Sequence, residues 1–213
     1  MVRTASDESQ GGIRTRGNTE KLKWKPSTVL SPVPVVMLTC KDQDVKPNII
    51  TVAWVGTVCS DPPMLSVSVR PERHSHALIA SSGEFVVNVP TRELTWATDY
   101  CGVASGRDVD KFERTGLTPG KAEAVGPPII EECPLNIECV VTQSIGLGSH
   151  TMFIARVVSV QVSAELVADD GRLALERAGL ITYAHGHYHS VGVQLGHFGF
   201  SVRRKPSERR VRR

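Results

Sequence analysis

The segment that decides the fold is Asn48 to His76, NIITVAWVGTVCSDPPMLSVSVRPERHSH. Two β-rich runs, 48–58 and 64–69, flank Ser60-Asp61-Pro62-Pro63, whose prolines end one strand and force a turn. Together with an earlier run at 35–39, which is followed by a polar turn at 41–47, they predict an antiparallel meander of three strands.

Basic and hydroxyl side chains gather at the end of this segment. Strand alternation in the third run places its apolar residues on a core face and puts Ser68 and Arg70 on the opposite, polar face. Arg73 and Ser75 follow directly before a helical pattern at 76–82, so Ser75 can cap that helix while its hydroxyl and the free N–H groups meet an anion. An ordinary helix cap beside a solvated charge cluster would give the same pattern.

The rest of the chain is predicted to consist mainly of strands. The helix at 76–82 ends at Gly83, and helical character returns at 92–100. Many strands with few helices favour an antiparallel barrel over a βαβ sheet. Further strands are expected at 84–89, 135–143, 151–162 and 180–183, with a glycine-bearing hairpin turn at 146–150 between the two longest.

A second basic loop lies at 102–111, where Ser105 offers a hydroxyl and Lys111 a cation. The loop lacks the G-x-x-x-x-G-K-[ST] spacing of a Walker loop, and no G-x-G-x-x-G stands between a strand and a helix. The sequence therefore favours neither a nucleoside-triphosphate loop nor a Rossmann dinucleotide site.

Composition predicts one soluble, cytoplasmic domain. A chain of 213 residues with 40% hydrophobic residues can fill a substantial core. Five cysteines without C-x-x-C spacing suit a reducing compartment, as buried thiols rather than a disulfide framework. The N-terminus lacks the apolar stretch of a signal peptide, and no run approaches the roughly 18 apolar residues of a membrane span.

Charge divides the chain into a body and a basic tail. Residues 203–213 hold seven basic residues and one acidic residue, a net charge of +6, which leaves −3 on the remainder. Such a tail is more often a solvated end than a nucleic-acid clamp, so a nucleic-acid partner is not expected. We expect a flexible arm at 1–23, one domain at 24–202 and this tail at 203–213.

The motifs together resemble the flavin reductase-like family of FMN-binding split barrels, most closely its flavoredoxin-type branch. The resemblance covers roughly residues 34 to 204 and implies a mainly β, Greek-key-like split barrel with a few short helices. Its matching segments, in order, are NIITVAWVGTVCSDPPMLSVSVRPERHSHALI, SGEFVVNVPT, TDYCGVASGRDVDKF, GLTPG, IEECPLNIECVV, GSHTMFIARVV and LGHFGFSVR.

The resemblance also implies a set of site residues. It places side chains or backbone groups beside the flavin ring, and a hydroxyl and a cation at its phosphate. By position these are Asn48, Thr51, Val52, Ala53, Trp54, His150 and Tyr183 for the ring, with His150 also close to the nicotinamide path as the catalytic candidate, and Ser75 and Lys111 for the phosphate. Ser68, Arg70, Arg73 and Ser105 are added from their local chemistry. Without the family context, Trp54 would be read as core and His150 as a surface residue.

In this family FMN accepts hydride from NADH or NADPH and passes electrons to a further acceptor, which the sequence does not identify. Members are homodimers with the flavin near the subunit interface. A flavin carrier or sensor without nicotinamide turnover is the alternative. His185, His187 and His189 would share one face of an extended strand and could bind a metal adventitiously, but no metal site is expected.

Overall fold

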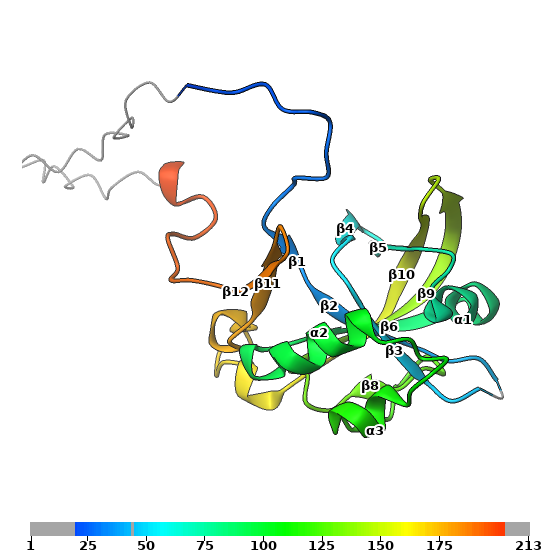
Figure 1. The fold of residues 1–213 in the computed structure, drawn as a ribbon. Coiled ribbons are helices and arrows are strands. Elements are labelled where there is room, and N and C mark those ends of the chain that lie inside the picture. Colours follow the sequence, from blue (N-terminus) through cyan, green and yellow to red (C-terminus); the bar gives the residue numbers. More distant parts are fainter. Residues whose placement is uncertain (1–19, 44, 203–213) are drawn as a thin grey trace, which may run out of the picture.

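The structure, a computed structural model, describes residues 20–43 and 45–202 and is built mainly from antiparallel strands (Figure 1). Most of the expected arm at 1–23 and the whole basic tail at 203–213 lie outside the described residues. The main sheet has seven strands in the order β3-β2-β6-β9-β10-β5-β4. Its strands are β2 (Val36–Cys40), β3 (Asn48–Val52), β4 (Val55–Ser60), β5 (Pro63–Val69), β6 (Glu84–Val89), β9 (Leu135–Gly146) and β10 (Thr151–Val162).

The two outermost strands of this sheet are consecutive in the chain, which forces the sheet to curl. Only Ala53 and Trp54 separate β3 from β4, although five strands lie between them in the sheet order. At the junction, Ser68 N–H donates to the Trp54 carbonyl oxygen over 2.9 Å. The sheet therefore folds back on itself as a barrel, as the antiparallel β prediction required.

The predicted three-strand meander is wrong in one respect. The run at 48–58 is not one strand, because it breaks at Ala53 and Trp54. Its first part, β3, pairs with β2, and its second part, β4, pairs with β5. Ala53 and Trp54, which connect β3 to β4, therefore lie at the rim of the barrel and outside the named strands.

Three short helices cover the barrel: α1 (His74–Ser82), α2 (Thr95–Val103) and α3 (Lys111–Thr115). Gly83 ends α1 with φ 70, the left-handed conformation expected of a glycine cap. The start of α1 corrects the sequence interpretation, because Arg73 holds the N-cap position and Ser75 lies inside the first turn. The single-turn helix η1 (Arg92–Leu94) leads into α2.

The expected loop at 102–111 is shorter than predicted. Helix α2 continues to Val103, and Lys111 begins α3. Asp110 caps α3 by accepting from the Glu113 N–H over 3.2 Å. Figure 1 shows α2 and α3 on the same side of the barrel, beside β3.

Two small sheets complete the fold. The first joins β1 (Val33–Pro34), β11 (Ile181–Ala184) and β12 (His187–Ser190), and the second pairs β7 (Pro119–Gly120) with β8 (Ile129–Ile130). The expected one-sided histidine triplet does not form, because His185 lies in the β11–β12 turn with φ 48. Only His187 and His189 share β12, with ring centroids 6.3 Å apart.

Strand β3 lies between two apolar cores. Ile50 and Val52 belong to the core inside the barrel, which includes Phe85 and Phe153. Ile49 belongs to a second core beneath the helices. Because neighbouring residues of β3 face opposite cores, the strand is packed on both faces. It therefore forms a rigid support for the residues and cavities beside it.

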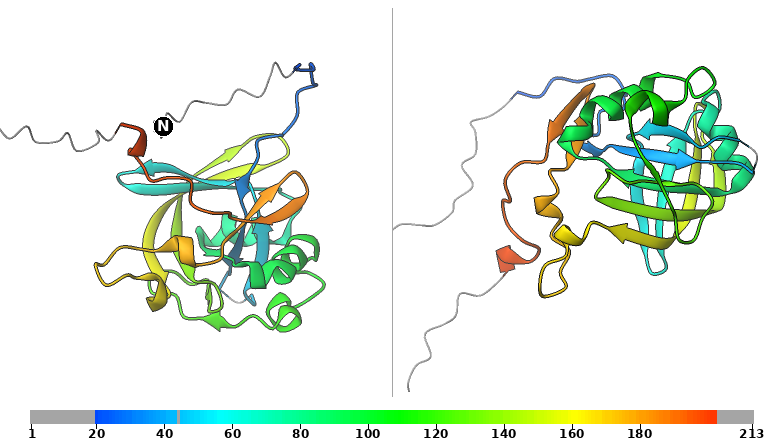
Figure 2. Two further views of the ribbon diagram at one scale, coloured as in Figure 1. Left: turned by 90° about the vertical axis from the view of Figure 1, so that its left-hand side faces the viewer. Right: turned by 90° about the horizontal axis from the view of Figure 1, so that it is seen from below.

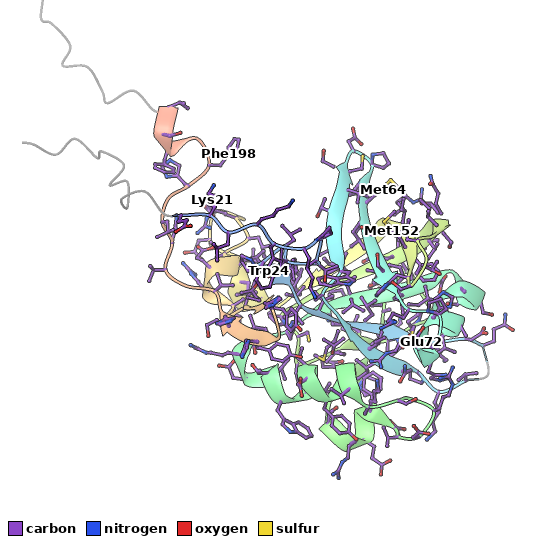
Figure 3. The ribbon with its side chains drawn as sticks, turned by 45° about the horizontal axis from the view of Figure 1, so that its top comes forward. Lys21, Trp24, Met64, Glu72, Met152 and Phe198 are labelled. Carbon is purple, nitrogen blue, oxygen red and sulfur yellow. The ribbon has the colours of Figure 1, made fainter. Side chains whose placement is uncertain are left out.

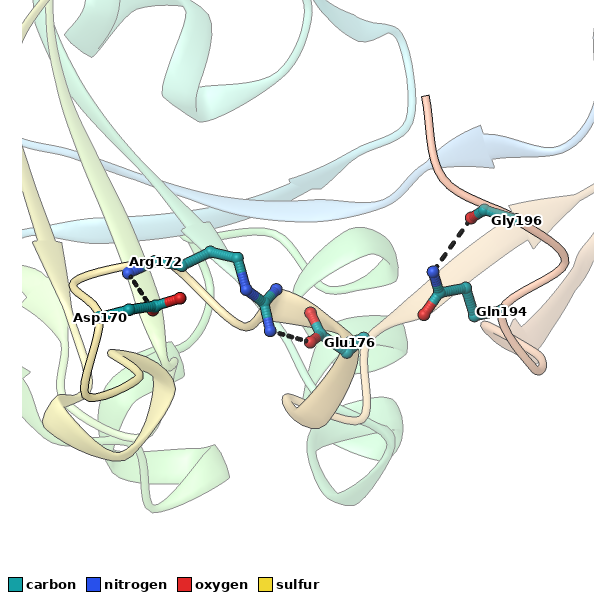
Figure 4. A network of polar contacts seen from close by, with 5 residues as sticks. All are labelled: Asp170, Arg172, Glu176, Gln194 and Gly196. Atoms are coloured by element: carbon teal, nitrogen blue, oxygen red, sulfur yellow. Dashed lines mark hydrogen bonds and ion pairs between the residues drawn. The ribbon is translucent and has the colours of Figure 1, made fainter. Parts of the chain in front are cut away.

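The segments at both ends of the described chain leave the barrel on the same side (Figure 2). Figure 3 shows Trp24 and Phe198 on these segments, apart from Met64 and Met152 on the barrel. The C-terminal part of the described chain, after β10, contains three short 3-10 helices: η2 (Ala164–Leu166), η3 (Leu175–Arg177) and η4 (Phe200–Val202). Local polar contacts order it: Arg172 donates to Glu176 and Asp170, and Gln194 donates to the Gly196 carbonyl (Figure 4).

Candidate functional site

A cavity of about 520 Å³ opens where β3, β5, α2 and the β11–β12 hairpin meet. We call it the large cavity. Its floor is the second half of β3 with the Ala53-Trp54 connection, and its rim carries ionisable side chains. The residues that line it are Val35, Ile50, Thr51, Val52, Ala53, Trp54, Ser68, Val69, Arg70, Glu72, Arg73, Asp99, Gly102, Val103, His150, Tyr183, Gly186 and Tyr188.

A second cavity of about 190 Å³, the polar cavity, continues from the first along β3. The two share Ile50, Glu72 and Arg73 as a common wall. The remaining lining comes from the start of β3, the first turn of α1 and the loop before α3: Asn48, His74, Ser75, Ala104, Ser105, Gly106, Arg107 and Lys111.

The thirteen site residues proposed from the sequence all line one of these two cavities. Nine surround the large cavity: Thr51, Val52, Ala53, Trp54, Ser68, Arg70, Arg73, His150 and Tyr183. Asn48, Ser75, Ser105 and Lys111 surround the polar cavity, and Arg73 borders both. Segments up to 135 residues apart in the chain thus meet at two adjoining cavities, both lined in part by β3.

Asn48 and Ser75 form the innermost wall of the polar cavity. Both are buried, and the Asn48 amide donates to the Ser75 hydroxyl over 2.7 Å. Gly106 presses against this pair, because a Cβ added there would lie 2.0 Å from Asn48 Oδ1. The SGRDVDKF segment therefore needs a glycine at this position for close approach of the backbone.

Lys111 is almost fully buried, with 4% of its surface exposed. Its ammonium donates to the Ile49 carbonyl over 2.7 Å and to the Cys101 carbonyl over 2.8 Å. Burial, helped by the charge of Arg73, lowers the pKa of Lys111 from 10.5 to about 8. No carboxylate contacts this ammonium in the described chain, so an anion in the polar cavity would stabilise its charged form.

Three more basic side chains surround the polar cavity. The Arg73 guanidinium donates to the Gly102 carbonyl and ties the start of α1 to the end of α2. Arg107 Nη1 donates to the Glu72 carbonyl over 3.0 Å. The pKa of His74 is lowered by burial and then by the charges of Arg107 and Lys111. The electrostatics of the cavity therefore suit an anion such as a phosphate.

The walls of the large cavity are held by contacts between distant elements. The Thr51 hydroxyl donates to the Thr98 carbonyl over 2.5 Å, which fixes β3 against α2. Tyr183 and Tyr188 meet edge to face with centroids 5.6 Å apart. The Tyr188 hydroxyl donates to Asp99 over 3.0 Å and fastens the β11–β12 hairpin to α2.

Asp99 and Tyr188 were not among the residues proposed from the sequence. Tyr188 lies in the histidine-rich segment, and the signal for it would have been a hairpin that pairs it with Tyr183 on the neighbouring strand. Asp99 precedes Tyr100 on α2, and nothing in its local pattern marks it.

His150 and Arg70 stand at the mouth of the large cavity. His150 directly precedes β10, and its Nδ1 lies 2.9 Å from the Ser149 hydroxyl. Arg70 pairs with Glu72 over 2.8 Å, so part of its charge is already offset. Both side chains line the large cavity, whereas Lys111 and Ser75 line the polar cavity.

Two further findings concern metals and membranes. Within residues 20–43 and 45–202, no cluster of three or more His, Cys, Asp or Glu residues could hold a metal ion. The same part of the chain contains no helix of the length and apolarity needed to cross a bilayer.

Comparisons with known proteins agree on one family. Residues 29–192 match the family model for the flavin reductase like domain. The chain is 38% identical to an uncharacterized protein of Archaeoglobus fulgidus over 54% of this chain and 65% of that protein. It spans 65%, 67% and 50% of the length of curated relatives from A. fulgidus, Pyrococcus abyssi and Aeropyrum pernix.

Two solved structures resemble the fold over their whole length. The flavoredoxin of Desulfovibrio vulgaris (Miyazaki F) has a TM-score of 0.81 and 31% identity, covering 86% of this chain and 100% of that one. A flavoredoxin from Methanosarcina acetivorans has a TM-score of 0.77 and 28% identity, covering 87% of this chain and 100% of that one.

Proposed function

Because the chain belongs to the flavin reductase-like family, we propose that it is an oxidoreductase that binds FMN and takes hydride from NADH or NADPH. The observation that carries this proposal is a pair of adjoining cavities lined by β3, one of about 520 Å³ and a smaller basic one of about 190 Å³, which share Ile50, Glu72 and Arg73. A flat ring system with a phosphate at the end of a chain has this shape and charge distribution.

The polar cavity fits the phosphate of FMN. The first turn of α1 would offer its free N–H groups to the phosphate, and the buried Ser75 hydroxyl would add a polar group beside them. Lys111 and Arg73 supply positive charge from two other segments. In this arrangement Asn48 orients the Ser75 hydroxyl, and Ser105 shapes the loop by accepting from the Arg107 N–H over 3.2 Å.

The large cavity fits the isoalloxazine ring. Thr51, Val52 and Ala53 would present backbone groups to the ring edge, while Trp54 and Tyr183 would shield it from water. Thr51 is held in place by its bond to α2, so the floor does not need to reorganise on binding. Ser68 lines the opposite wall.

The residues at the cavity mouth would serve the nicotinamide nucleotide. FMN, when bound, supplies the hydride-accepting ring, and the protein supplies position and electrostatics. His150 would orient the nicotinamide at the opening, and Arg70 would attract its phosphates. The β11–β12 hairpin would limit the access of water from the other side. The electron acceptor would then bind at the same opening of the large cavity, as the second substrate.

An anaerobic stopped-flow experiment tests the proposal. The protein reconstituted with FMN is mixed with NADH or NADPH, and free FMN serves as the control. We expect flavin bleaching that is faster than the control and saturates with nucleotide concentration. Reduction at the rate of free FMN would leave the flavin carrier or sensor as the better interpretation, and failure to bind FMN would contradict both.

We also propose a homodimer with the cavity near its interface and a cytoplasmic location. At the cavity rim, the side chains of Trp54 and Val103 are 39% and 74% exposed, which leaves apolar surface for a second copy to cover. All five cysteines are free, and four are buried, as expected of a reducing compartment.

A further inference from the structure

A further cavity adjoins the large one, between the segment before β1 and the β11–β12 hairpin. Its volume is about 300 Å³, and we call it the side cavity. The residues that line it are Thr28, Leu30, Ser31, Val33, Trp54, Tyr183, His185 and Gly186. Trp54, Tyr183 and Gly186 also line the large cavity, so these three residues stand between the two.

The pairing of two distant strands holds the walls of the side cavity in place. In the pairing of β1 with β11, Val33 lies opposite Tyr183, and the Thr182 hydroxyl donates to the Val33 carbonyl over 2.7 Å. The segment before β1 is thereby anchored beside the hairpin. Gly186 has φ 94, and a Cβ added there would meet no heavy atom within 4 Å. The boundary between the two cavities is therefore open at this residue.

The lining of the side cavity is neutral, unlike that of the other two cavities. Its apolar and aromatic surface comes from Leu30, Val33, Trp54 and Tyr183. Its polar groups are two hydroxyls and the His185 imidazole, and no Asp, Glu, Lys or Arg of the described chain lines it. Charged side chains line both the large and the polar cavity. The side cavity therefore fits an uncharged, flat aromatic group that packs against the two aromatic side chains.

We propose that the side cavity selects the electron acceptor, and that this acceptor is a fused-ring quinone. The quinone ring lies at the opening of the large cavity, and the second, non-reacting ring lies in the side cavity against Leu30 and Trp54. The inference rests on the proposed function, which supplies the flavin and the nicotinamide nucleotide.

The chemistry of a quinone matches both cavities. It is neutral and flat, as the lining of the side cavity requires, and its carbonyl oxygens accept hydrogen bonds from hydroxyl or imidazole donors. Its reduction takes two electrons and one proton, as a hydride equivalent, from NADH or NADPH by way of the flavin. A second proton comes from solvent, so both carbonyls become hydroxyls and the nucleotide is oxidised. A single-ring quinone leaves the side cavity empty and is the poorer substrate.

The test compares menadione, a naphthoquinone, with toluquinone, its single-ring counterpart, as acceptors for the full chain loaded with FMN. Leu30→Ala removes part of the apolar wall of the side cavity alone. We expect kcat/KM for menadione to fall about fivefold and that for toluquinone to change less than about twofold, because only the second ring loses apolar contact. Leu22→Ala is the matched control: Leu22 is 79% exposed against 81% for Leu30, and it lines neither cavity.

A charged substitution at the same position and a binding measurement sharpen the test. Leu30→Asp places a carboxylate against the second ring and should lower kcat/KM for menadione about tenfold or more, whereas Leu22→Asp should not. Calorimetric titration of menadione into the same variants, without NADH or NADPH, should show its dissociation constant rising by similar factors. This second measurement separates acceptor binding from flavin reduction.

The outcomes separate this inference from the proposed function. If both Leu30 variants reduce menadione as the wild type does, the second ring lies elsewhere and the inference is wrong. It is also wrong if they impair the reduction of free riboflavin more than that of menadione, because the cavity then serves a second flavin. A change in the dimer dissociation constant with unchanged menadione kinetics would mean that a second copy covers the cavity. Failure of the wild type to bind FMN, or to be reduced by NADH or NADPH, would contradict the proposed function, and the calorimetric titration would still decide whether the side cavity binds menadione.

Discussion

We predict that Lys111 makes the proposed flavin binding depend on pH. Its lowered pKa of about 8 means that, without ligand, the ammonium loses its charge as pH rises through 8. A phosphate favours the charged form, so binding takes up a proton above pH 8, and the dissociation constant of FMN should rise about tenfold between pH 7 and pH 9. Burial raises the pKa of the neighbouring Cys40 and Cys101 thiols to about 12 and about 11, and His74 has a lowered pKa. These three groups therefore stay neutral across the window.

Lys111→Met should remove this pH dependence. The variant is expected to bind FMN more weakly at pH 7 and with a nearly constant affinity up to pH 9, measured by fluorescence titration. The two buried carbonyl partners of Lys111 also predict that its loss costs about 1–3 kcal/mol of stability. The folded lysine has a lower pKa than the unfolded one, so the wild-type free energy of unfolding should rise with pH between 8 and 10.5. A slope in Lys111→Met equal to that of the wild type would show that another group titrates.

Gly106→Ala should damage phosphate recognition selectively. The new Cβ would lie 2.0 Å from Asn48 Oδ1, so Asn48 must move and release the Ser75 hydroxyl. We expect FMN affinity to fall by about tenfold, while riboflavin, which lacks the phosphate, binds as before. Gly146→Ala is the matched control, since a Cβ there meets nothing within 4 Å. Equal losses for FMN and riboflavin would mean that the substitution disturbs both cavities.

At the scale of elements, the β11–β12 hairpin depends on one side-chain bond to α2. Tyr188 donates to Asp99, and burial followed by the Asp99 carboxylate raises the pKa of Tyr188, so the hydroxyl remains a donor. Tyr188→Phe should cost about 0.5–1.5 kcal/mol locally and increase hydrogen exchange at residues 181–190 without lowering global stability by more than that. Asp99→Asn keeps an acceptor and should have a smaller effect. Unchanged exchange in Tyr188→Phe would show that β1 pairing alone holds the hairpin.

The elements also show how far local sequence signals extend. The predicted end of α1 at Gly83 and the predicted bounds of β6 and β10 are confirmed. A glycine cap and an uninterrupted β-rich run can both be read from neighbouring residues alone. The break at Ala53-Trp54 was missed, since both residues fit a strand and the barrel closure that separates them is not local. The start of α3 at Lys111 was missed because a helix of five residues leaves hardly any periodic signal.

For the whole molecule, alternation tells which face of a strand is buried but not which strand lies next to it. In the sheet, β6 lies between β2 and β9. Buried polar contacts link these three strands, and strand alternation does not predict them. Asn88 on β6 donates to the Met37 carbonyl over 3.0 Å, and Asn136 on β9 donates to Asn88 over 2.8 Å. The candidate site was foreseeable from the family resemblance, whereas the places of Asp99 and Tyr188 at the large cavity depend on this long-range arrangement.

The proposed homodimer makes a prediction at the scale of the whole molecule. Phe198 and Leu195 are 106% and 92% exposed on a segment that leaves the barrel, so in a single chain their apolar surface meets only water. Phe198→Ser should therefore leave the stability of the monomer unchanged, but it should weaken the dimer by roughly 10- to 100-fold if a second copy buries this ring. Sedimentation at several protein concentrations measures the dissociation constant. Val160→Ser, at a 52% exposed position on β10, is the control.

Because Trp54 and Val103 at the cavity rim would lose their cover when the dimer separates, FMN retention should fall with the dimer fraction in Phe198→Ser. A dimer as tight as the wild type would show that the interface lies on another face and that Phe198 has no part in covering the site.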